Sequence, residues 1–469
     1  MIKVTTKKSI TNLNVLSGDF FIMARIAVIG AGYRGFCDAL ALCNEGHSVT
    51  IIDSAPFFGG IMNSIVMGDF VVDKGVHFFN SMPPAMIDIV TEIMDGKVKP
   101  IGFWSRGVYG EKVTENFSLP NLESENELTK SKILNELLDL AAKNAPASEA
   151  HDLQEYFNSN FGQTAGRIFG DIFEGIYHTK ACDAEQRAVK QTSLHRVKFL
   201  DDAKMMVLKD NPWLNDHVAA RREALGKIDD LTSVYPSDGN GMKGWCTKAS
   251  AWLEAKGVRI LLNTKITKIT PSEKEITISS DQEDWGFDRV VWSNDEVDDF
   301  AKMLGKDSDV GTLLKGTPLV FYSVVTKAEQ IREFTYHQNF DPSSAMFRAA
   351  AAGYYGNQID ANGNSFITVE CTANLDSEIW RDPNTNIQKI WAECKRDNIV
   401  DQDAEMLDYK FVKIPTSYKI RLNGYQNRFE SVCDWVSEYD KRLICRKSEP
   451  FFRREIYLDS LNLPDQIDA

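Results

Sequence analysis

Glycines and one aspartate near the amino terminus have the types and spacing of residues that bind a dinucleotide. The letters GAGYRG place Gly30, Ala31, Gly32 and Gly35 in the G-x-G-x-x-G pattern. The first glycine permits a tight turn, the second lets a pyrophosphate approach the backbone, and the third lets a helix pack closely on a strand. Asp53 follows, where a carboxylate can accept hydrogen bonds from ribose hydroxyls. An acid there favours a free 2′-hydroxyl, as in FAD or NAD, over NADP.

The elements that must position these residues occur in the expected order. The run RIAVIG, which ends at Gly30, is almost continuously apolar, as in a parallel strand covered on both faces. FCDALALCNEG then predicts a short helix that stops at Gly46. SVTIID predicts a second strand ending at Asp53. The sequence therefore predicts an α/β fold with a Rossmann-like, parallel-sheet domain, and the alternative is a glycine-rich turn without a ligand.

A second group of residues follows the glycine pattern along the chain. Gly59 and Gly60 form a pair soon after the second strand, and NSIVMGDFVV predicts a short hairpin. The hairpin leads to Asp73, Gly75 and His77 at alternate positions. A histidine within a strand is by itself an ordinary buried residue, so interest in His77 depends on the motifs that precede it.

Together these motifs resemble the FAD-dependent superfamily that contains amine oxidases, phytoene desaturases, protoporphyrinogen oxidases and UDP-galactopyranose mutases. The resemblance implies FAD as the cofactor, with Gly59 and Gly60 close to it. It implies that His77 lies beside the isoalloxazine ring, where it tunes or shields the flavin, and that Gly75 lets the strand approach the ring. Asn63 departs from the pattern, because an arginine near the cofactor phosphates is common at this position.

Two later segments continue the resemblance. The passage that begins YPSDGNGMKG is similar to the one that returns beneath the adenine, which implies that the backbone of Ile266 lies against the adenine. The alternative for Ile266 is a plain core position. The closing segment is similar to the strand and helix that meet the flavin pyrophosphate, where a positive helix end suits an anion. Arg446 matches the arginine of that segment and Asp459 lies near the position of its helix-start aspartate, while Cys445 stands where glycine is usual.

Residues 100–229 and 316–410 predict an inserted α+β substrate-binding domain. The first range has amphipathic helical stripes, and the second has apolar strand runs such as GTPLVFYSVV and SFITVECT. The resemblance implies that Tyr177, Lys180 and Arg348 bind substrate. In the mutases the corresponding arginine faces the substrate diphosphate, which a planar guanidinium pairs with in bidentate fashion. The alternative for Arg348 is an arginine on the surface or paired in the core.

The predicted FAD-binding domain is discontinuous. It comprises residues 24–99, 230–315 and 411–469. Residues 1–23 are predicted to form an amino-terminal extension, either disordered or upstream sequence counted from the wrong start codon.

Composition limits the other functions that the chain could have. The 469 residues are 43% hydrophobic, which allows two or three domains, and the net charge of −14 argues against a general nucleic-acid binder. The eight cysteines are scattered, so no zinc site or disulfide framework is expected and a reducing cytoplasm is the default. No apolar run approaches the roughly 20 residues of a membrane span. Motifs of zincins, α/β-hydrolases and P-loop NTPases do not occur in the sequence, and the histidines show no metal-ligand spacing.

Three functional hypotheses follow. The first is an FAD-dependent oxidoreductase of the protoporphyrinogen oxidase and amine oxidase type, which transfers a hydride from a small-molecule substrate to flavin N5. The second is a UDP-galactopyranose mutase-like flavoenzyme acting on a nucleotide sugar in surface polysaccharide synthesis, although Cys182 stands where the mutases have a tryptophan. The third is a non-catalytic flavin-binding protein. Substrate identity, electron acceptor and oligomeric state are left open.

Overall fold

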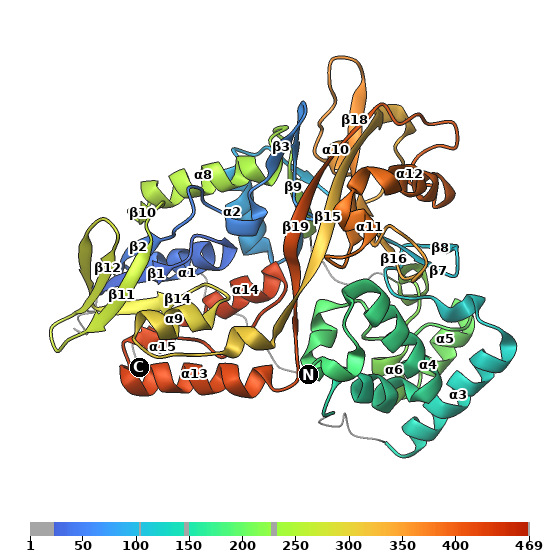
Figure 1. Ribbon diagram of the computed structural model, residues 1–469, viewed down its shortest axis with the longest axis horizontal. Coiled ribbons are helices and arrows are strands. Elements are labelled where there is room, and N and C mark those ends of the chain that lie inside the picture. The colour runs from blue at the N-terminus through green and yellow to red at the C-terminus, as the bar shows by residue number, and fades with distance from the viewer. Residues whose placement is uncertain (1–22, 103–104, 145–149, 227–231, 468–469) are drawn as a thin grey trace.

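The computed structural model describes residues 23–102, 105–144, 150–226 and 232–467 (Figure 1). Residues 1–22, nearly all of the predicted amino-terminal extension, lie outside the described residues. Within the described part of the chain, no helix combines the length and the apolar character that a bilayer crossing requires.

A five-stranded parallel sheet carries the amino-terminal motifs. Its central strand β1 (Arg25–Ile29) lies between β2 (Ser48–Ile52) and β14 (Arg289–Trp292). The outer strands are β10 (Arg259–Leu261), beside β2, and β20 (Leu443–Ile444), beside β14. All but the first residue of β1 and of β2 are buried, which accounts for their continuous apolar runs. The expected α/β fold with a parallel Rossmann-like sheet is confirmed.

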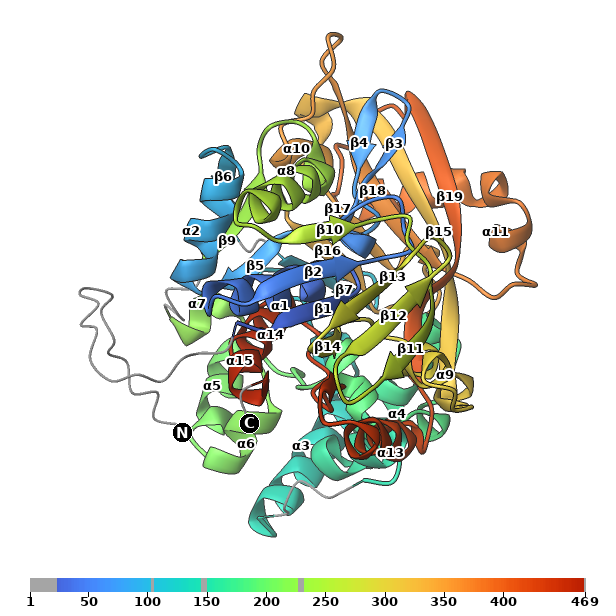
Figure 2. The same cartoon turned by 90° about the vertical axis from the view of Figure 1, so that its left-hand side faces the viewer.

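Alternate side chains of β1 enter two different cores. Ile26 and Val28 pack in one core with the helices α1 (Tyr33–Asn44) and α8 (Gly241–Ala255). The last helices of the chain, α14 (Arg453–Ser460) and α15 (Leu463–Ile467), pack beside α1 in this core (Figure 2).

The opposite face of β1, with Ala27 and Ile29, contacts a second core. Its other elements are a three-stranded antiparallel sheet and two helices. These are β11 (Ile266–Pro271), β12 (Ile276–Ser280), β13 (Asp284–Phe287), α9 (Val297–Met303) and α13 (Tyr425–Tyr439). The parallel sheet is therefore covered on both faces, as its composition predicts.

A seven-stranded mixed sheet forms the other large layer, and its long strands β15 and β19 run through the middle of Figure 1. In spatial order its strands are β19 (Asp408–Arg421), β15 (Leu314–Lys327), β18 (Asn364–Thr372), β17 (Arg348–Ala350), β16 (Tyr336–Asn339), β7 (Ser105–Tyr109) and β8 (Lys112–Glu115). Because β19 pairs with β15 from Asp408 to Arg421, it continues past residue 410, where the sequence analysis placed a domain boundary.

A helical unit packs against one end of this sheet, on the far side of β15 and β19 from α1 (Figure 1). It contains α3 (Glu127–Ala142), α4 (Leu153–Tyr177), α5 (Asp202–Lys209) and α6 (Pro212–His217). The apolar stripes of α4 that the sequence showed are buried in this unit, so they form core.

Smaller elements connect the layers. Two small antiparallel sheets pair β3 (Ile65–Met67) with β4 (Phe70–Val72), and β9 (Thr232–Pro236) with both β5 (Phe79–Met82) and β6 (Val98–Pro100). The remaining α-helices are α2 (Pro84–Ile93), α7 (Arg222–Leu225), α10 (Ala352–Tyr355), α11 (Glu378–Arg381) and α12 (Ile387–Arg396). The β3–β4 pair is the hairpin that the sequence predicted before Asp73.

Candidate functional site

The glycine turn, residues 30–35, joins β1 to α1 and is open at Gly32. Gly30 has a φ of +115°, and its N–H donates to the Ile52 carbonyl oxygen at 2.9 Å. A Cβ on Gly35 would overlap the Gly30 carbonyl oxygen, so helix and strand approach too closely for any side chain. A Cβ on Gly32 would meet no heavy atom within 4 Å, and Gly32 is the N-cap of α1, which therefore has no side-chain cap. The turn therefore fits an anion such as a phosphate.

Asp53 lies immediately beyond β2, beside the glycine turn. Its Oδ2 accepts a hydrogen bond from the Ala31 N–H at 2.6 Å, and its Oδ1 accepts one from the Ala55 N–H at 2.7 Å. The Thr264 N–H donates to the Asp53 carbonyl oxygen at 3.0 Å. A carboxylate offers about four acceptor positions. Since the side chain is partly exposed, Asp53 keeps capacity for ribose hydroxyls.

The predicted glycine pair packs against the glycine turn. The Gly59 N–H donates to the Ala31 carbonyl oxygen at 2.8 Å. A Cβ on Gly60 would lie 3.3 Å from the Gly32 Cα, and one on Gly59 would overlap the Cys246 side chain of α8. The structure thus brings both predicted glycine motifs into one place, and close packing explains why glycine is needed there.

Ile266 begins β11 two residues after Thr264, which bonds Asp53. Its side chain is buried in the same core as Ile29 and Ile52. The side chain is therefore a core residue, and contact of its backbone with an adenine stays a prediction.

Asp73 anchors the turn that carries His77. The buried carboxylate accepts hydrogen bonds from the Ser64 hydroxyl at 2.5 Å, the Tyr235 hydroxyl at 2.6 Å and the Met242 N–H at 3.1 Å. Burial raises the pKa of the Asp73 carboxyl, and the three donors oppose that rise. The aspartate of the D-x-G-x-H motif thus ties the β4–β5 connection to α8. The sequence did not predict this role, because Tyr235 and Met242 are distant from Asp73 along the chain.

His77 is buried at the end of this turn. Its Nδ1 lies 2.6 Å from Nη2 of Arg453, and its Nε2 has no hydrogen-bond partner among the described residues. A Cβ on Gly75 would lie 3.7 Å from that Nε2. Burial, followed by the charges of Arg453, Arg348 and Lys74, holds the pKa of His77 well below its usual value. His77 is therefore neutral at neutral pH.

The predicted substrate arginine meets the same turn. A Cβ on Gly75 would lie 3.6 Å from Arg348 Nη2 and 3.6 Å from Glu370 Oε1. Arg348 donates to the buried Glu370 carboxylate from Nε at 2.8 Å and from Nη2 at 2.7 Å. The Tyr418 hydroxyl donates to Glu370 at 2.9 Å. Arg348 is thus paired in the core and also lies at the junction with the His77 turn, which fits both interpretations of its sequence position.

The two other predicted substrate residues differ in location. Tyr177 ends α4, is buried, and its ring centroid lies 6.1 Å from that of Phe347 and 5.7 Å from that of Tyr418. Burial raises the pKa of the Tyr177 phenol. Lys180 is exposed. The structure therefore joins Tyr177 to the Arg348 group through Tyr418 and leaves Lys180 at the surface.

Arg446 and Asp459 belong to a charge cluster on the flank of α1, defined by Arg34, Asp38, Arg446 and Asp459. Asp38 and Arg446 are buried, and Arg34 and Asp459 are partly exposed. Arg446 pairs with Asp38, and its Nη1 lies 3.2 Å from Asp459 Oδ2. Arg34 Nη2 lies 3.1 Å from the same Asp459 oxygen. The two cations and two carboxylates thus neutralise one another, so their charges are paired within the cluster. The sequence analysis named Arg446 and Asp459 but missed Asp38, because no local pattern distinguishes an aspartate within an apolar helix.

Asp459 lies in the last turn of α14, whereas the resemblance implied a position at the start of a helix. The helix begins earlier because the Glu455 carboxylate accepts hydrogen bonds from the N–H groups of Phe451 at 2.9 Å and Phe452 at 3.2 Å. This cap brings Arg453 to the first position of α14 and so to His77. The sequence signal that could have revealed it is the acid three residues after the N-cap.

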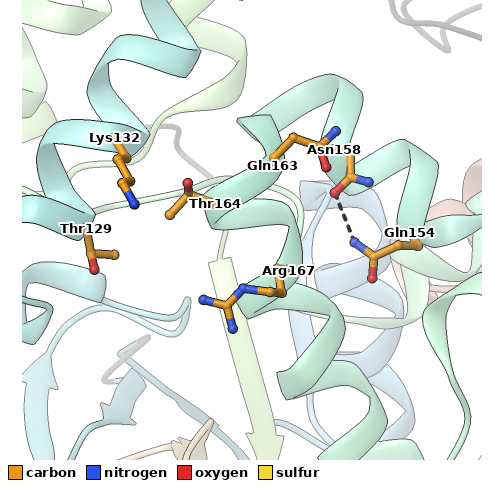
Figure 3. Close-up of a pocket in the computed structure, with 7 residues that line it drawn as sticks. All are labelled: Thr129, Lys132, Gln154, Asn158, Gln163, Thr164 and Arg167. Carbon is orange, nitrogen blue, oxygen red and sulfur yellow. Dashed lines mark hydrogen bonds between the residues drawn. The ribbon is translucent and has the colours of Figure 1, made fainter.

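A polar pocket of about 520 Å³ opens between α3 and α4, away from all these residues (Figure 3). It is lined by Thr129, Lys132, Gln154, Asn158, Gln163, Thr164 and Arg167. The Gln154 amide donates to Asn158 Oδ1 at 3.0 Å along its wall. No predicted site residue lines this pocket.

Comparison with known proteins agrees with this geometry. Residues 28–93 match the family described as NAD(P)-binding Rossmann-like domain. A probable zeta-carotene desaturase of Synechococcus elongatus is 41% identical over 56 residues, which are 12% of each protein. Protoporphyrinogen oxidase 2 of Arabidopsis thaliana is 24% identical over 178 residues, 36% of this chain and 35% of the relative. The chain thus matches only about a third or less of each relative's length.

The fold extends much further than the sequence identity. The crystal structure of a reduced UDP-galactopyranose mutase superposes with a TM-score of 0.70 and 15% identity, over 95% of each chain. The family match agrees with the dinucleotide-binding motifs of the amino-terminal segment, and the superposition shows that the two chains share one fold.

Proposed function

We propose that the protein binds FAD and is an oxidoreductase of the protoporphyrinogen oxidase and amine oxidase type. The observation that carries this proposal is the junction at Gly75, where the turn from the dinucleotide-binding part brings His77 beside Arg348 of the seven-stranded sheet. Such a junction offers a buried, polar place for a reacting group between a cofactor domain and a substrate domain. Bound FAD would supply the hydride acceptor, flavin N5, for oxidation of a small-molecule substrate.

The residues fit FAD best at its adenosine and pyrophosphate half. Gly32 opens the start of α1 to a phosphate, and Asp53 keeps free acceptor positions for a ribose. Gly59 and Gly60 would border the same region, and the backbone at Ile266 the adenine. Arg446 and Asp459 would act indirectly, by holding α14 against α1.

At the flavin half of FAD, the chain's own residues would orient the substrate and exclude water. His77 is buried and neutral, and a Cβ on Gly75 would be in van der Waals contact with the side chains of His77 and Arg348. Arg348, held by Glu370, and the phenol of Tyr177 would contact polar groups of the substrate. Lys180, which lies at the surface, would reach the substrate only where the site meets solvent.

The proposal is tested by anaerobic reduction of the FAD-loaded protein. Candidate amines, porphyrinogens and polyenes are added, and loss of oxidised-flavin absorbance is followed. We expect one class to bleach the flavin, and Arg348→Met to slow that bleaching more than Arg332→Met, an exposed control. Flavin that dithionite reduces but no substrate does would contradict an oxidoreductase of this type.

The second candidate function is that of a UDP-galactopyranose mutase-like enzyme acting on a nucleotide sugar. It is favoured by the TM-score of 0.70 over 95% of both chains. Exposed Lys180 and Cys182 weigh against it. Conversion of UDP-galactopyranose by pre-reduced protein alone, with a spectral shift on adding UDP, would select this function instead of the first.

A further inference from the structure

Arg453 reaches the His77 ring from the opposite end of the chain. Each of its three nitrogens contacts a different acceptor: Nε lies 3.4 Å from Met62 Sδ, Nη1 lies 3.1 Å from the Phe78 carbonyl oxygen, and Nη2 lies 2.6 Å from His77 Nδ1. None of these three acceptors is a carboxylate. The guanidinium is therefore held by neutral groups, one of which is the imidazole.

This contact determines where the proton of His77 lies. A guanidinium has hydrogens on all its nitrogens and can only donate, so Nδ1 of His77 must accept. A neutral imidazole carries one proton, which then lies on Nε2. That nitrogen is buried, has no hydrogen-bond partner among the described residues and points to the side of Gly75.

The charged groups around His77 oppose a second proton. They come from three elements: Lys74 on the turn itself, Arg348 on β17 and Arg453 on α14. The Lys74 backbone faces the ring and raises the pKa of His77, but burial and the three charges outweigh it. The nearby carboxylate of Glu370 on β18 is already engaged by Arg348. The imidazole consequently stays neutral, and a charged donor at Nδ1 biases its tautomers by roughly tenfold to a hundredfold.

We propose that Arg453 is a positioning residue that sets His77 as a hydrogen-bond donor, through Nε2–H, toward the junction at Gly75. His77 then offers a proton to an acceptor atom there and cannot act as a base at neutral pH through Nδ1. The acceptor is an oxygen or ring nitrogen of the flavin or the substrate, and this identification of the acceptor rests on the proposed function. The tautomer itself does not depend on it.

The test is nitrogen NMR of full-length protein with ¹⁵N-labelled histidine, without flavin, with His77→Gln used for assignment. We expect wild-type His77 to show a protonated Nε2 and an unprotonated Nδ1 at neutral pH, with any titration at lower pH than that of an exposed histidine. Arg453→Met should produce a tautomer mixture and shift the titration upward. Arg453→Lys, which keeps a charge and a donor, should restore the wild-type signal, and Arg454→Met at the exposed neighbouring position should leave it unchanged.

A wild-type proton on Nδ1, or an unchanged His77 signal in Arg453→Met, would overturn the inference. A misfolded Arg453→Met would be recognised from the other histidine signals. The wild-type spectrum would then decide, because a proton on Nε2 supports the inference and a proton on Nδ1 overturns it. Addition of FAD separates the two proposals. If FAD does not bind, the proposed function fails while the tautomer assignment stands. If FAD binds to a protein whose His77 carries Nδ1–H, only the assignment fails.

Discussion

The glycine turn and the charge cluster lie against the same helix, α1, yet their polar groups are satisfied in different ways. At the glycine turn, Gly32 faces open space and, among the described residues, the partly exposed Asp53 carboxylate accepts hydrogen bonds only from the N–H groups of Ala31 and Ala55. In the cluster, Asp38 is 0% exposed and Arg446 is 7% exposed, and each charge faces a counter-charge. The turn therefore has capacity for a ligand, whereas the cluster stabilises the fold. Variants that separate ligand affinity from stability test this difference.

The largest effect is expected in the cluster. Asp38→Ala leaves the buried Arg446 without its main counter-charge and two hydroxyl donors without an acceptor, so the free energy of unfolding should fall by about 3–5 kcal/mol. Urea unfolding followed by circular dichroism measures it, with the exposed Glu45→Ala, immediately after the same helix, as control. A loss below about 1 kcal/mol would show that the cluster is not a structural element.

A smaller effect, on affinity, is expected at the strand end. Asp53→Ala removes the proposed ribose acceptor, so the Kd for FAD should rise by roughly 10- to 100-fold. Titration of FAD against protein fluorescence measures this Kd, and Asp69→Ala, in the exposed turn between β3 and β4, is the control. If Asp53→Ala binds FAD as tightly as that control, Asp53 is not a ligand residue.

Gly32→Ala separates ligand affinity from stability more sharply than the other variants. The backbone of Gly32, at φ −74° and ψ −175°, suits any residue, and the added methyl meets no heavy atom within 4 Å. The free energy of unfolding should therefore change by less than about 1 kcal/mol, while the Kd for FAD rises about tenfold because the methyl blocks close approach of the pyrophosphate. Equal FAD affinity in both proteins would contradict a phosphate site at the turn.

The smallest effect is the contribution of His77 to pH dependence. Folded His77 stays neutral, so below a pH of about 6.5 the unfolded chain binds the additional proton and stability falls as pH falls. His77→Gln should reduce this slope by up to about 1.4 kcal/mol per pH unit between about pH 5 and 6.5. Urea unfolding at several pH values measures the slope, with the exposed His151→Gln as control. A slope unchanged by His77→Gln would mean that the ring is not held neutral.

The parts of the molecule that the sequence predicted are those with local patterns. The run from Arg25 to Asp53 contains its own strand, turn, helix and strand, so its geometry follows from residues near one another. The motif at His77 was placed by resemblance, and the structure brings it to Arg348 and, through Tyr418, to Tyr177.

The parts that the sequence did not predict depend on contacts between distant segments. Arg453 and His77 are 376 residues apart, and Arg446 and Asp38 are 408 residues apart. Such pairs leave no periodicity to detect. The start of α14 was misplaced for a local reason, since the Glu455 cap extends the helix ahead of Asp459. The helix start is therefore where the resemblance was least informative.

The most direct test of the central claim is the visible absorbance spectrum of the purified protein, before and after incubation with FAD and removal of free cofactor. The account predicts oxidised-flavin bands at one FAD per chain, reduced or lost in Gly32→Ala and Asp53→Ala. A protein that remains colourless after loading, while correctly folded, would contradict it.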